Sequence, residues 1–234
     1  MRGVLTVLLA LGATGAAAEC RQALALGLDV SASVDGVEYG QQLGGLATAL
    51  EDAAVQQALF AIPGAWVDLA VFEWSGPAFG RIIQHWTTLS DPAALADVTA
   101  KLRVTQREAS DPSTAIGSAM RFGAALLAQR AACWRAVLDL SGDGLSNTGP
   151  RPRDVIPTLT GPTLSGLTVN GLAIADPGGG SDLAAYYRAE VMTGLGAFVE
   201  EARGFEDYAE AMRRKLLREL QVLAVSGRVL PPAQ

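Results

Sequence analysis

The feature that most constrains this chain is an apolar stretch, residues 24–28, that leads directly into an acid and two alternating hydroxyls. The acid is Asp29 and the hydroxyls are Ser31 and Ser33. A short continuous apolar run bounded by polar turn residues indicates a strand covered on both faces, as in a parallel sheet. Ligands of open α/β sheets bind beyond the carboxyl ends of such strands. Because the three side chains offer only hard oxygen ligands, they predict a site for Mg²⁺ or Ca²⁺ at this edge of the sheet.

Further strands alternate with helices along the chain, which favours a mainly parallel sheet with helices on both faces. Few residues separate the second and third strands, so we expect the third to lie antiparallel at the sheet edge. No repeat or long linker divides the sequence, and the prediction is one doubly wound α/β domain. Strands are expected at 66–74, 81–87, 134–140, 167–175 and 197–199, and helices after Asp35 (with Glu38 as a capping box), Asp91, Thr114 and Asp182 and over 205–223.

The first 18 residues have the pattern of a secretory signal peptide. Arg2 provides a positive start, residues 4–11 an apolar core, and three alanines precede Glu19. The core is too short to cross a membrane, and a retained N-terminal anchor is the alternative. A lipoprotein is disfavoured because Glu19 stands where a small residue must precede Cys20. We therefore expect an exported protein, periplasmic or secreted, whose mature domain is residues 19–234 and has no transmembrane segment.

Three separated parts of the sequence carry a family resemblance. They are the Asp-x-Ser-x-Ser motif at Asp29, Ser31 and Ser33, then Thr114 on a loop that opens a helix, and then Asp143 after a later strand. Together they resemble the metal-ion-dependent adhesion site (MIDAS) of von Willebrand factor A (VWA) domains, over roughly residues 19–223. Within that superfamily the chain is most similar to the bacterial exported DUF1194 family, through residues 71–76, 141–144, 170–172, 185–187 and 205–207.

The resemblance implies a role for each of the five residues. The hydroxyls of Ser31 and Ser33 would coordinate the metal directly, and Asp29 and Asp143 would hold it largely through waters. Thr114 would coordinate directly or through a water. One position would remain for an Asp or Glu carboxylate of a protein partner. Mg²⁺ suits such a mixed shell because it keeps several waters, with Mn²⁺ or Ca²⁺ as alternatives.

The sequence departs from the common VWA pattern at the second acid. An Asp-Gly pair usually follows the strand at once, whereas here Ser141 and Gly142 precede Asp143. The extra residues would shift Asp143 or make Asp139 the better-placed acid. Asp143 is preferred because Asp139 lies inside an apolar run and faces a helix layer. Glu73, at the end of a neighbouring strand, is a candidate for an acid behind the ligands, against a locally paired or solvated carboxylate.

The two cysteines, Cys20 and Cys133, are predicted to form a disulfide, with two buried free thiols as the alternative. Cys20 lies nine residues before Asp29 and Cys133 lies ten before Asp143. If these acids end neighbouring parallel strands, both cysteines lie together at the opposite edge of the sheet.

The function we expect is a non-enzymatic binding module that presents a divalent cation to an acidic residue of a protein partner. A metal-assisted hydrolase using the same pocket and a structural domain with a vestigial site are the alternatives. Nucleic acid is disfavoured because the net charge is −6 and no basic stripe is present. His85 is the single histidine and is expected to be structural, so a His-rich zinc site is excluded. Residues 178–180 are read as a plain glycine loop, and Arg213, Arg214 and Lys215 as a solvated helix face.

Overall fold

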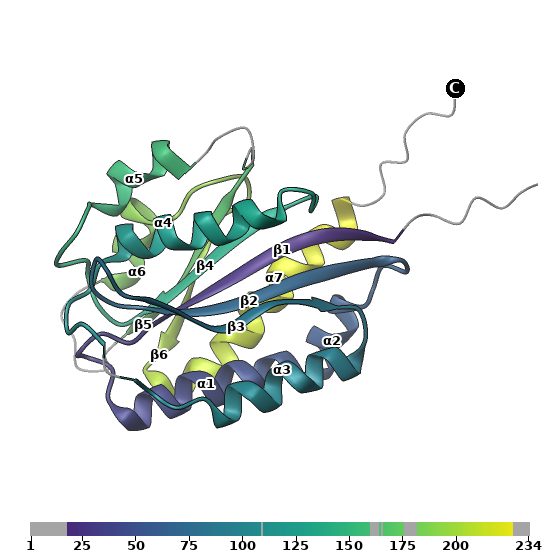
Figure 1. Cartoon of the computed structure of the whole chain (residues 1–234), viewed down its shortest axis with the longest axis horizontal. Coiled ribbons are helices and arrows are strands. Elements are labelled where there is room, and N and C mark those ends of the chain that lie inside the picture. The colour runs from purple at the N-terminus through teal and green to yellow at the C-terminus, as the bar shows by residue number, and fades with distance from the viewer. Residues whose placement is uncertain (1–17, 109, 160–163, 165, 176–181, 227–234) are drawn as a thin grey trace, which may run out of the picture.

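The computed structural model describes residues 18–108, 110–159, 164, 166–175 and 182–226. The predicted signal peptide, apart from Ala18, and the glycine loop at 178–180 lie outside the described residues. Six strands form one sheet in the order β3-β2-β1-β4-β5-β6, parallel except for the antiparallel edge strand β3 (Figure 1). The predicted α/β fold is confirmed. The strands are β1 (Glu19–Asp29), β2 (Ala65–Trp74), β3 (Gly80–Leu89), β4 (Ala136–Gly142), β5 (Thr168–Ala175) and β6 (Val199–Arg203).

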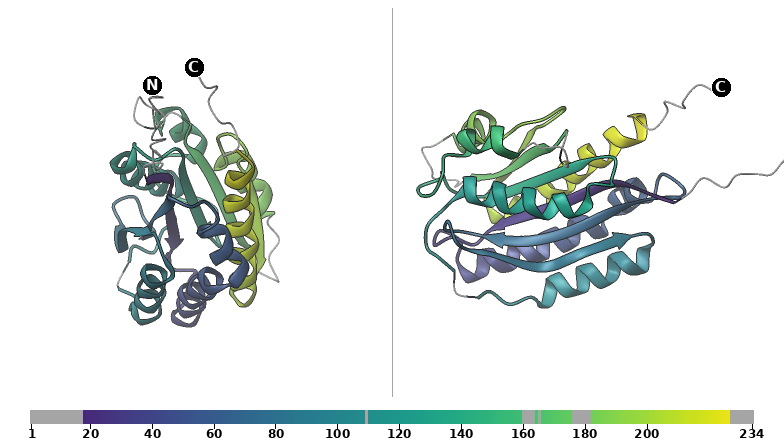
Figure 2. Two further views of the ribbon diagram at one scale, coloured as in Figure 1. Left: turned by 90° about the vertical axis from the view of Figure 1, so that its right-hand side faces the viewer. Right: turned by 45° about the horizontal axis from the view of Figure 1, so that its top comes forward.

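Helices cover both faces of the sheet (Figures 1 and 2). One face packs against α1 (Gly36–Glu51), α2 (Ala53–Leu59), α3 (Pro92–Val104) and α7 (Tyr208–Ser226). The other face packs against α4 (Ile116–Leu127), α5 (Pro152–Leu159) and α6 (Leu183–Glu190). Two short 3₁₀ turns are also present: η1 (Ala128–Arg130) follows α4, and η2 (Phe205–Asp207) precedes α7. Among the described residues, no helix has both the length and the apolar character that crossing a bilayer requires.

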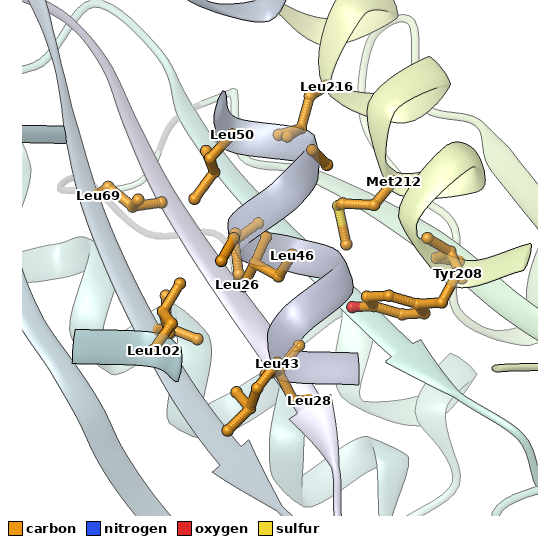
Figure 3. Close-up of a cluster of buried hydrophobic side chains, with 14 of the residues drawn as sticks. Leu26, Leu28, Leu43, Leu46, Leu50, Leu69, Leu102, Tyr208, Met212 and Leu216 are labelled. Atoms are coloured by element: carbon orange, nitrogen blue, oxygen red, sulfur yellow. The ribbon is translucent and has the colours of Figure 1, made fainter. Parts of the chain in front are cut away.

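Alternating side chains of the central strand β1 enter two separate cores, because successive residues of a strand point to opposite faces. Leu24, Leu26 and Leu28 lie on the face of α1 and α7, where leucines of α1 pack against Met212 and Leu216 of α7 (Figure 3). Ala23 and Ala25 lie on the face of α4 and α6. By the same alternation Asp29 points to the α4 and α6 face. Burial on both sides explains why β1 is an uninterrupted apolar run.

The predicted caps are present. Asp35 accepts hydrogen bonds from the backbone N–H groups of Val37 and Glu38, and the Glu38 carboxylate accepts one from the backbone N–H of Asp35. Asp91 and Asp182 likewise accept from the first turns of α3 and α6. Each cap satisfies N–H groups that have no partner within the helix.

Two differences from the predicted elements have a clear local cause. The helix after Asp35 is interrupted at Asp52, whose side chain caps a second helix, α2, by accepting from Ala54 N and Val55 N. The last strand is residues 199–203 and not 197–199. Its residues are mostly polar, so the sequence shows no apolar pattern that would predict a strand there. As an edge strand it buries only Ala202, while Glu200 and Glu201 pair with arginines of neighbouring helices.

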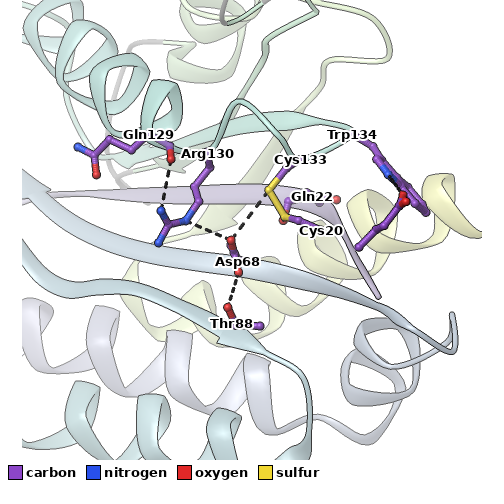
Figure 4. The surroundings of a disulfide bond; sticks show 9 residues. Cys20, Gln22, Asp68, Thr88, Gln129, Arg130, Cys133 and Trp134 are labelled. Atoms are coloured by element: carbon purple, nitrogen blue, oxygen red, sulfur yellow. Dashed lines mark hydrogen bonds and ion pairs between the residues drawn. A yellow bond between two sulfur atoms is a disulfide. The ribbon is translucent and has the colours of Figure 1, made fainter. Parts of the chain in front are cut away.

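The disulfide joins Cys20 on β1 to Cys133 just before β4 (Figure 4). The Cα atoms are 4.6 Å apart and 113 residues separate the two cysteines. Asp68 Oδ2 lies 4.0 Å from the Cys133 sulfur and pairs with Arg130 at 3.1 Å. Closing a loop of this length stabilises a fold by about 4–5 kcal/mol on the chain-entropy model.

Lys215 corrects the expectation of a solvated basic face on the last helix. Arg213 and Arg214 pair with surface acids, but Lys215 is fully buried. Its ammonium contacts Asp139 of β4, and Glu219 Oε1 lies 3.2 Å away. Burial lowers the pKa of Lys215, but the two carboxylates outweigh it and raise the pKa above the ordinary value. The α7 helix is thus joined to the sheet by a buried charge, which a sequence pattern of three basic residues does not reveal.

We expect Lys215→Met to lower the free energy of unfolding by about 3–5 kcal/mol, because it leaves the buried Asp139 carboxylate without its cation. Denaturant titration monitored by circular dichroism measures the change. Arg213→Met is the matched control, because it removes a surface cation two residues before Lys215 on the same helix. It is expected to change the free energy of unfolding by about 0.5 kcal/mol or less. Equal effects of the two variants would contradict the buried-pair assignment.

Candidate metal centre

The candidate site lies where the strand order reverses, beyond the carboxyl ends of β1 and β4. Leu28 is paired with Ser141, so Asp29 and Gly142 are at the same level of the sheet. Ser141 and Gly142 still belong to β4, and Asp143 follows the strand directly. The apparent departure from the VWA pattern is therefore an extension of the strand that leaves Asp143 beside the loop after β1.

Four of the five predicted ligands form one hydrogen-bonded chain. The backbone N–H of Ser31 donates to Asp29 Oδ1 at 2.8 Å. The hydroxyl oxygens of Ser31 and Ser33 are 3.2 Å apart, and Ser33 Oγ donates to Asp143 Oδ1 at 2.8 Å. The chain runs outward, because Asp29 and Ser31 are buried, Asp143 is half-buried and Ser33 is exposed. The structure thus brings these oxygens together and opens the cluster to solvent at Ser33.

Thr114 lies in the loop that leads into α4, next to the loop after β4. Its Oγ1 is 3.7 Å from the position that a Cβ on Gly144 would take. Its backbone N–H donates to the side chain of Asn147 at 2.9 Å, and its carbonyl accepts from the N–H of Asn147 at 2.9 Å. Asn147, which the sequence gave no reason to select, therefore ties the Thr114 loop to the Asp143 loop.

Arg107 and Ser110, which precede Thr114 in the chain, support the site from a third side. Arg107 donates to the carbonyls of Val30 and Ser31, each at 3.2 Å, and Ser110 Oγ donates to Val30 O at 2.6 Å. The sequence pattern predicts no role for Arg107 or Ser110. Backbone carbonyls as acceptors leave no signature in a sequence, so contacts of this kind are visible only in the fold.

The surroundings of Asp29 show whether these residues suit a bound cation. Asp29 Oδ2 is buried and has no hydrogen-bond partner among the described residues. Burial raises the pKa of Asp29 to about 7, opposed by the hydrogen bonds from Ser31 and, more weakly, by Arg107. Burial likewise raises the pKa of Asp143, opposed by the Ser33 hydroxyl. A buried carboxylate with an unused oxygen, next to two hydroxyls and a second acid, fits a hard divalent cation.

Asp139 and Glu73, the other acids considered from the sequence, both pair with side chains outside the candidate site. Asp139 lies on the α7 face of the sheet, opposite to Asp29, and pairs with Lys215. Glu73 accepts from the Tyr39 hydroxyl at 2.6 Å and from Arg81 at 2.7 and 2.9 Å. Glu73 is therefore a locally paired carboxylate that fixes the end of β2. His85 is exposed on the edge strand β3.

A second group with metal-like spacing is not a metal site. Ligand atoms of Cys20, Asp68 and Cys133 lie within 4.8 Å of one another. The two sulfurs are bonded in the disulfide, and the carboxylate pairs with Arg130 (Figure 4). A cation there would have one carboxylate and a competing guanidinium.

A groove of about 700 Å³ opens beside the candidate centre, between the start of α1 and the region where β5 and β6 end. Ser33 and Asp143 form one wall of it, and Phe205 and Arg203 the other. Val37, on the α1 side, exposes 70% of its surface. The cluster therefore faces a space large enough for a peptide side chain and its neighbours.

A sheet of this order, with clustered side-chain oxygens at the ends of β1 and β4, is similar to the fold of VWA domains, and solved structures agree. Proximal thread matrix protein 1 from the mussel byssus, with a zinc-occupied MIDAS motif, matches 88% of this chain at 15% identity and TM-score 0.61. A von Willebrand factor type A structure from Catenulispora acidiphila matches 86% at 15% identity and TM-score 0.58. The pilus adhesin SpaC from Lactobacillus rhamnosus GG matches 86% at 12% identity and TM-score 0.55.

This chain covers 49%, 43% and 30% of those proteins, so it spans about half of their length or less. At such identities the likeness concerns the fold. The chain belongs to the family described as protein of unknown function, DUF1194, whose model matches residues 19–224. No curated protein matches the sequence. The family resemblance drawn from the motifs is confirmed.

The raised pKa of Asp29 predicts how stability depends on pH when metal is chelated. The folded state binds the Asp29 proton more tightly than the unfolded state does, so proton binding at Asp29 stabilises the fold. This stabilisation is complete below about pH 4 and is lost as the pH rises to about 7. We expect the free energy of unfolding to fall across that window, by about 4 kcal/mol at most from this group. Asp29→Asn keeps the acceptor for Ser31 N and is expected to flatten the slope. Denaturant titrations in chelator between pH 4.5 and 7.5 measure it. Parallel profiles of the two proteins would contradict the assignment.

Proposed function

We propose that this protein is an exported, non-enzymatic binding module that holds a divalent cation at the ends of β1 and β4 and offers it to a carboxylate of a protein partner. The observation that carries the proposal is the buried Asp29 carboxylate, linked through Ser31 and Ser33 to Asp143 at the surface. The VWA fold and its MIDAS-bearing neighbour support it. Export is supported by the signal-peptide pattern and by the disulfide, which is typical of oxidising compartments.

The residues have distinct tasks in this function. The hydroxyls of Ser31, Ser33 and Thr114 are neutral oxygen ligands, so they bind a cation without cancelling its charge. Asp29 and Asp143 supply the negative charge, and their hydrogen bonds to Ser31 N and Ser33 Oγ hold them in place. The bound cation supplies positive charge that attracts an incoming carboxylate. Mg²⁺ is the proposed ion, with Mn²⁺ or Ca²⁺ as alternatives.

The partner is proposed to be a protein segment with an exposed Asp or Glu. Asp35, Glu38 and Glu206 also line the groove beside the site, so an acidic segment finds no general attraction there without the cation. Binding is therefore expected to depend on the metal. The exposed apolar surface of Val37 favours apolar residues next to the partner's acid.

We expect isothermal titration of Mg²⁺ or Mn²⁺ into the mature, chelator-treated protein to show one site. Ser31→Ala and Asp143→Ala are each expected to weaken affinity at least tenfold, because each removes an oxygen that a hard cation requires. Ser90→Ala is the matched control. Ser90 is exposed beyond the end of β3, at the opposite edge of the sheet, and bonds only to Asp91 among the described residues. Absence of binding to Mg²⁺, Mn²⁺ and Ca²⁺, with and without added acetate, would reject the proposed centre.

We expect a short peptide with one Asp between apolar residues to bind the Mg²⁺-loaded protein with a dissociation constant of about 1 mM or lower. The same peptide with Asn is expected to bind at least tenfold more weakly, because the amide lacks the negative charge. Heteronuclear NMR titration, with residues 31–37 and 143–145 as reporters, measures both. Equal binding of the two peptides, or binding that persists in chelator, would show that the cation does not receive the partner's acid.

A further inference from the structure

Tyr187 of α6 reaches across two strands toward the candidate centre. Its side chain is fully buried on the face of the sheet that carries Asp29. A Cβ added to Gly171 of β5 would lie 2.5 Å from the Tyr187 ring, and one added to Gly142 of β4 would lie 2.8 Å from its hydroxyl. The ring therefore crosses β5 and β4 at two positions where only glycine leaves room.

The end of this path is the carboxylate of Asp29. The same point above Gly142 that is 2.8 Å from the Tyr187 hydroxyl is 2.9 Å from Asp29 Oδ2. Both atoms are buried, and neither has a hydrogen-bond partner among the described residues. A buried donor and a buried acceptor without partners each cost free energy, so their convergence on one small space calls for an explanation.

We propose that Tyr187 is a positioning residue for the metal centre, whose hydroxyl donates to Asp29 Oδ2 directly or through one water. The inference rests on the proposed function and adds a residue from α6 to it. Ser31 N already fixes Oδ1 of the same carboxylate. A second donor at Oδ2 stabilises the ionised form of Asp29 and fixes its orientation.

A phenol suits this position better than a cationic donor. Lys or Arg at the same place would neutralise Asp29 and repel an incoming divalent cation. A phenol donates a proton and adds no charge, so the full negative charge of Asp29 remains available. On the opposite face Lys215 neutralises Asp139 in that way, and Asp139 takes no part in the site.

The approach of Tyr187 to Asp29 explains why β4 ends in a glycine at position 142. Any side chain at position 142 would occupy the space between Asp29 and Tyr187. The same holds at position 171 for the ring itself. The Ser-Gly-Asp-Gly sequence, in which Ser141 and Gly142 end β4, thus leaves the opening through which Tyr187 of α6 reaches Asp29.

The test is Tyr187→Phe, which keeps the buried ring and removes only the hydroxyl. We expect the dissociation constant for Mg²⁺ or Mn²⁺, measured by calorimetry, to rise about tenfold or more. The denaturation midpoint in chelator is expected to fall as well, because the buried Asp29 Oδ2 loses its donor. A purely structural tyrosine would lower the midpoint and leave the affinity unchanged.

Tyr208→Phe is the matched control. Tyr208 is equally buried, but on the α1 and α7 face, where its hydroxyl lies 3.2 Å from Ser141 Oγ. Its variant is expected to lower the denaturation midpoint and to leave the metal affinity within twofold.

The outcomes separate this inference from the function on which it rests. If the wild-type protein binds no metal, the proposed function fails and the role of Tyr187 falls with it. If the wild type binds and Tyr187→Phe binds within twofold, the centre stands and the role of Tyr187 is overturned. A tenfold loss in Tyr187→Phe, with Tyr208→Phe unchanged, supports it.

Discussion

The Asp29 carboxylate lies fully buried at the end of the central strand, and the local structure is arranged around it. Its Oδ1 is bonded to the N–H of Ser31, which turns the chain so that the hydroxyls of Ser31 and Ser33 follow in sequence toward Asp143. Arg107 and Ser110 hold the carbonyls of the same turn. No cation among the described residues pairs directly with it, and burial raises its pKa. Such a group favours either a proton or a metal ion.

The same pair of strands carries a second buried acid with the opposite arrangement. Asp139 is on β4, three positions before the strand end, and points to the other face, where Lys215 neutralises it. Glu219, whose pKa is raised by burial and by Asp139, lies beside the pair. One carboxylate thus receives its positive charge from the chain and serves to join α7 to the sheet. The other receives none from the described residues, which is why it fits a ligand site and Asp139 does not.

The fold is similar to that of VWA domains, and the chain belongs to the family DUF1194. The solved relatives are longer proteins that include a byssal matrix protein and a pilus adhesin, and this chain corresponds to a part of each. Three further features of this chain are the end of β4 at Gly142, the buried Tyr187 near Asp29, and the disulfide at the opposite edge of the sheet. Two of these three bear directly on the candidate centre.

The sequence by itself determined the α/β class, the antiparallel edge strand, the helix caps and the four oxygen-bearing side chains that meet at one sheet edge. Those features follow from local rules: apolar runs, cap residues close to their helices, and the alternation of strand side chains. Only the tertiary structure decided that Lys215 of α7 is buried against Asp139 of β4, and that Arg107 and Asn147 hold the loops around the oxygen cluster. These roles depend on contacts between residues far apart in the chain, and on backbone carbonyls and glycine gaps that no local pattern records. The physical reason is that burial, which sets the energy of each charge, is a property of the packed structure.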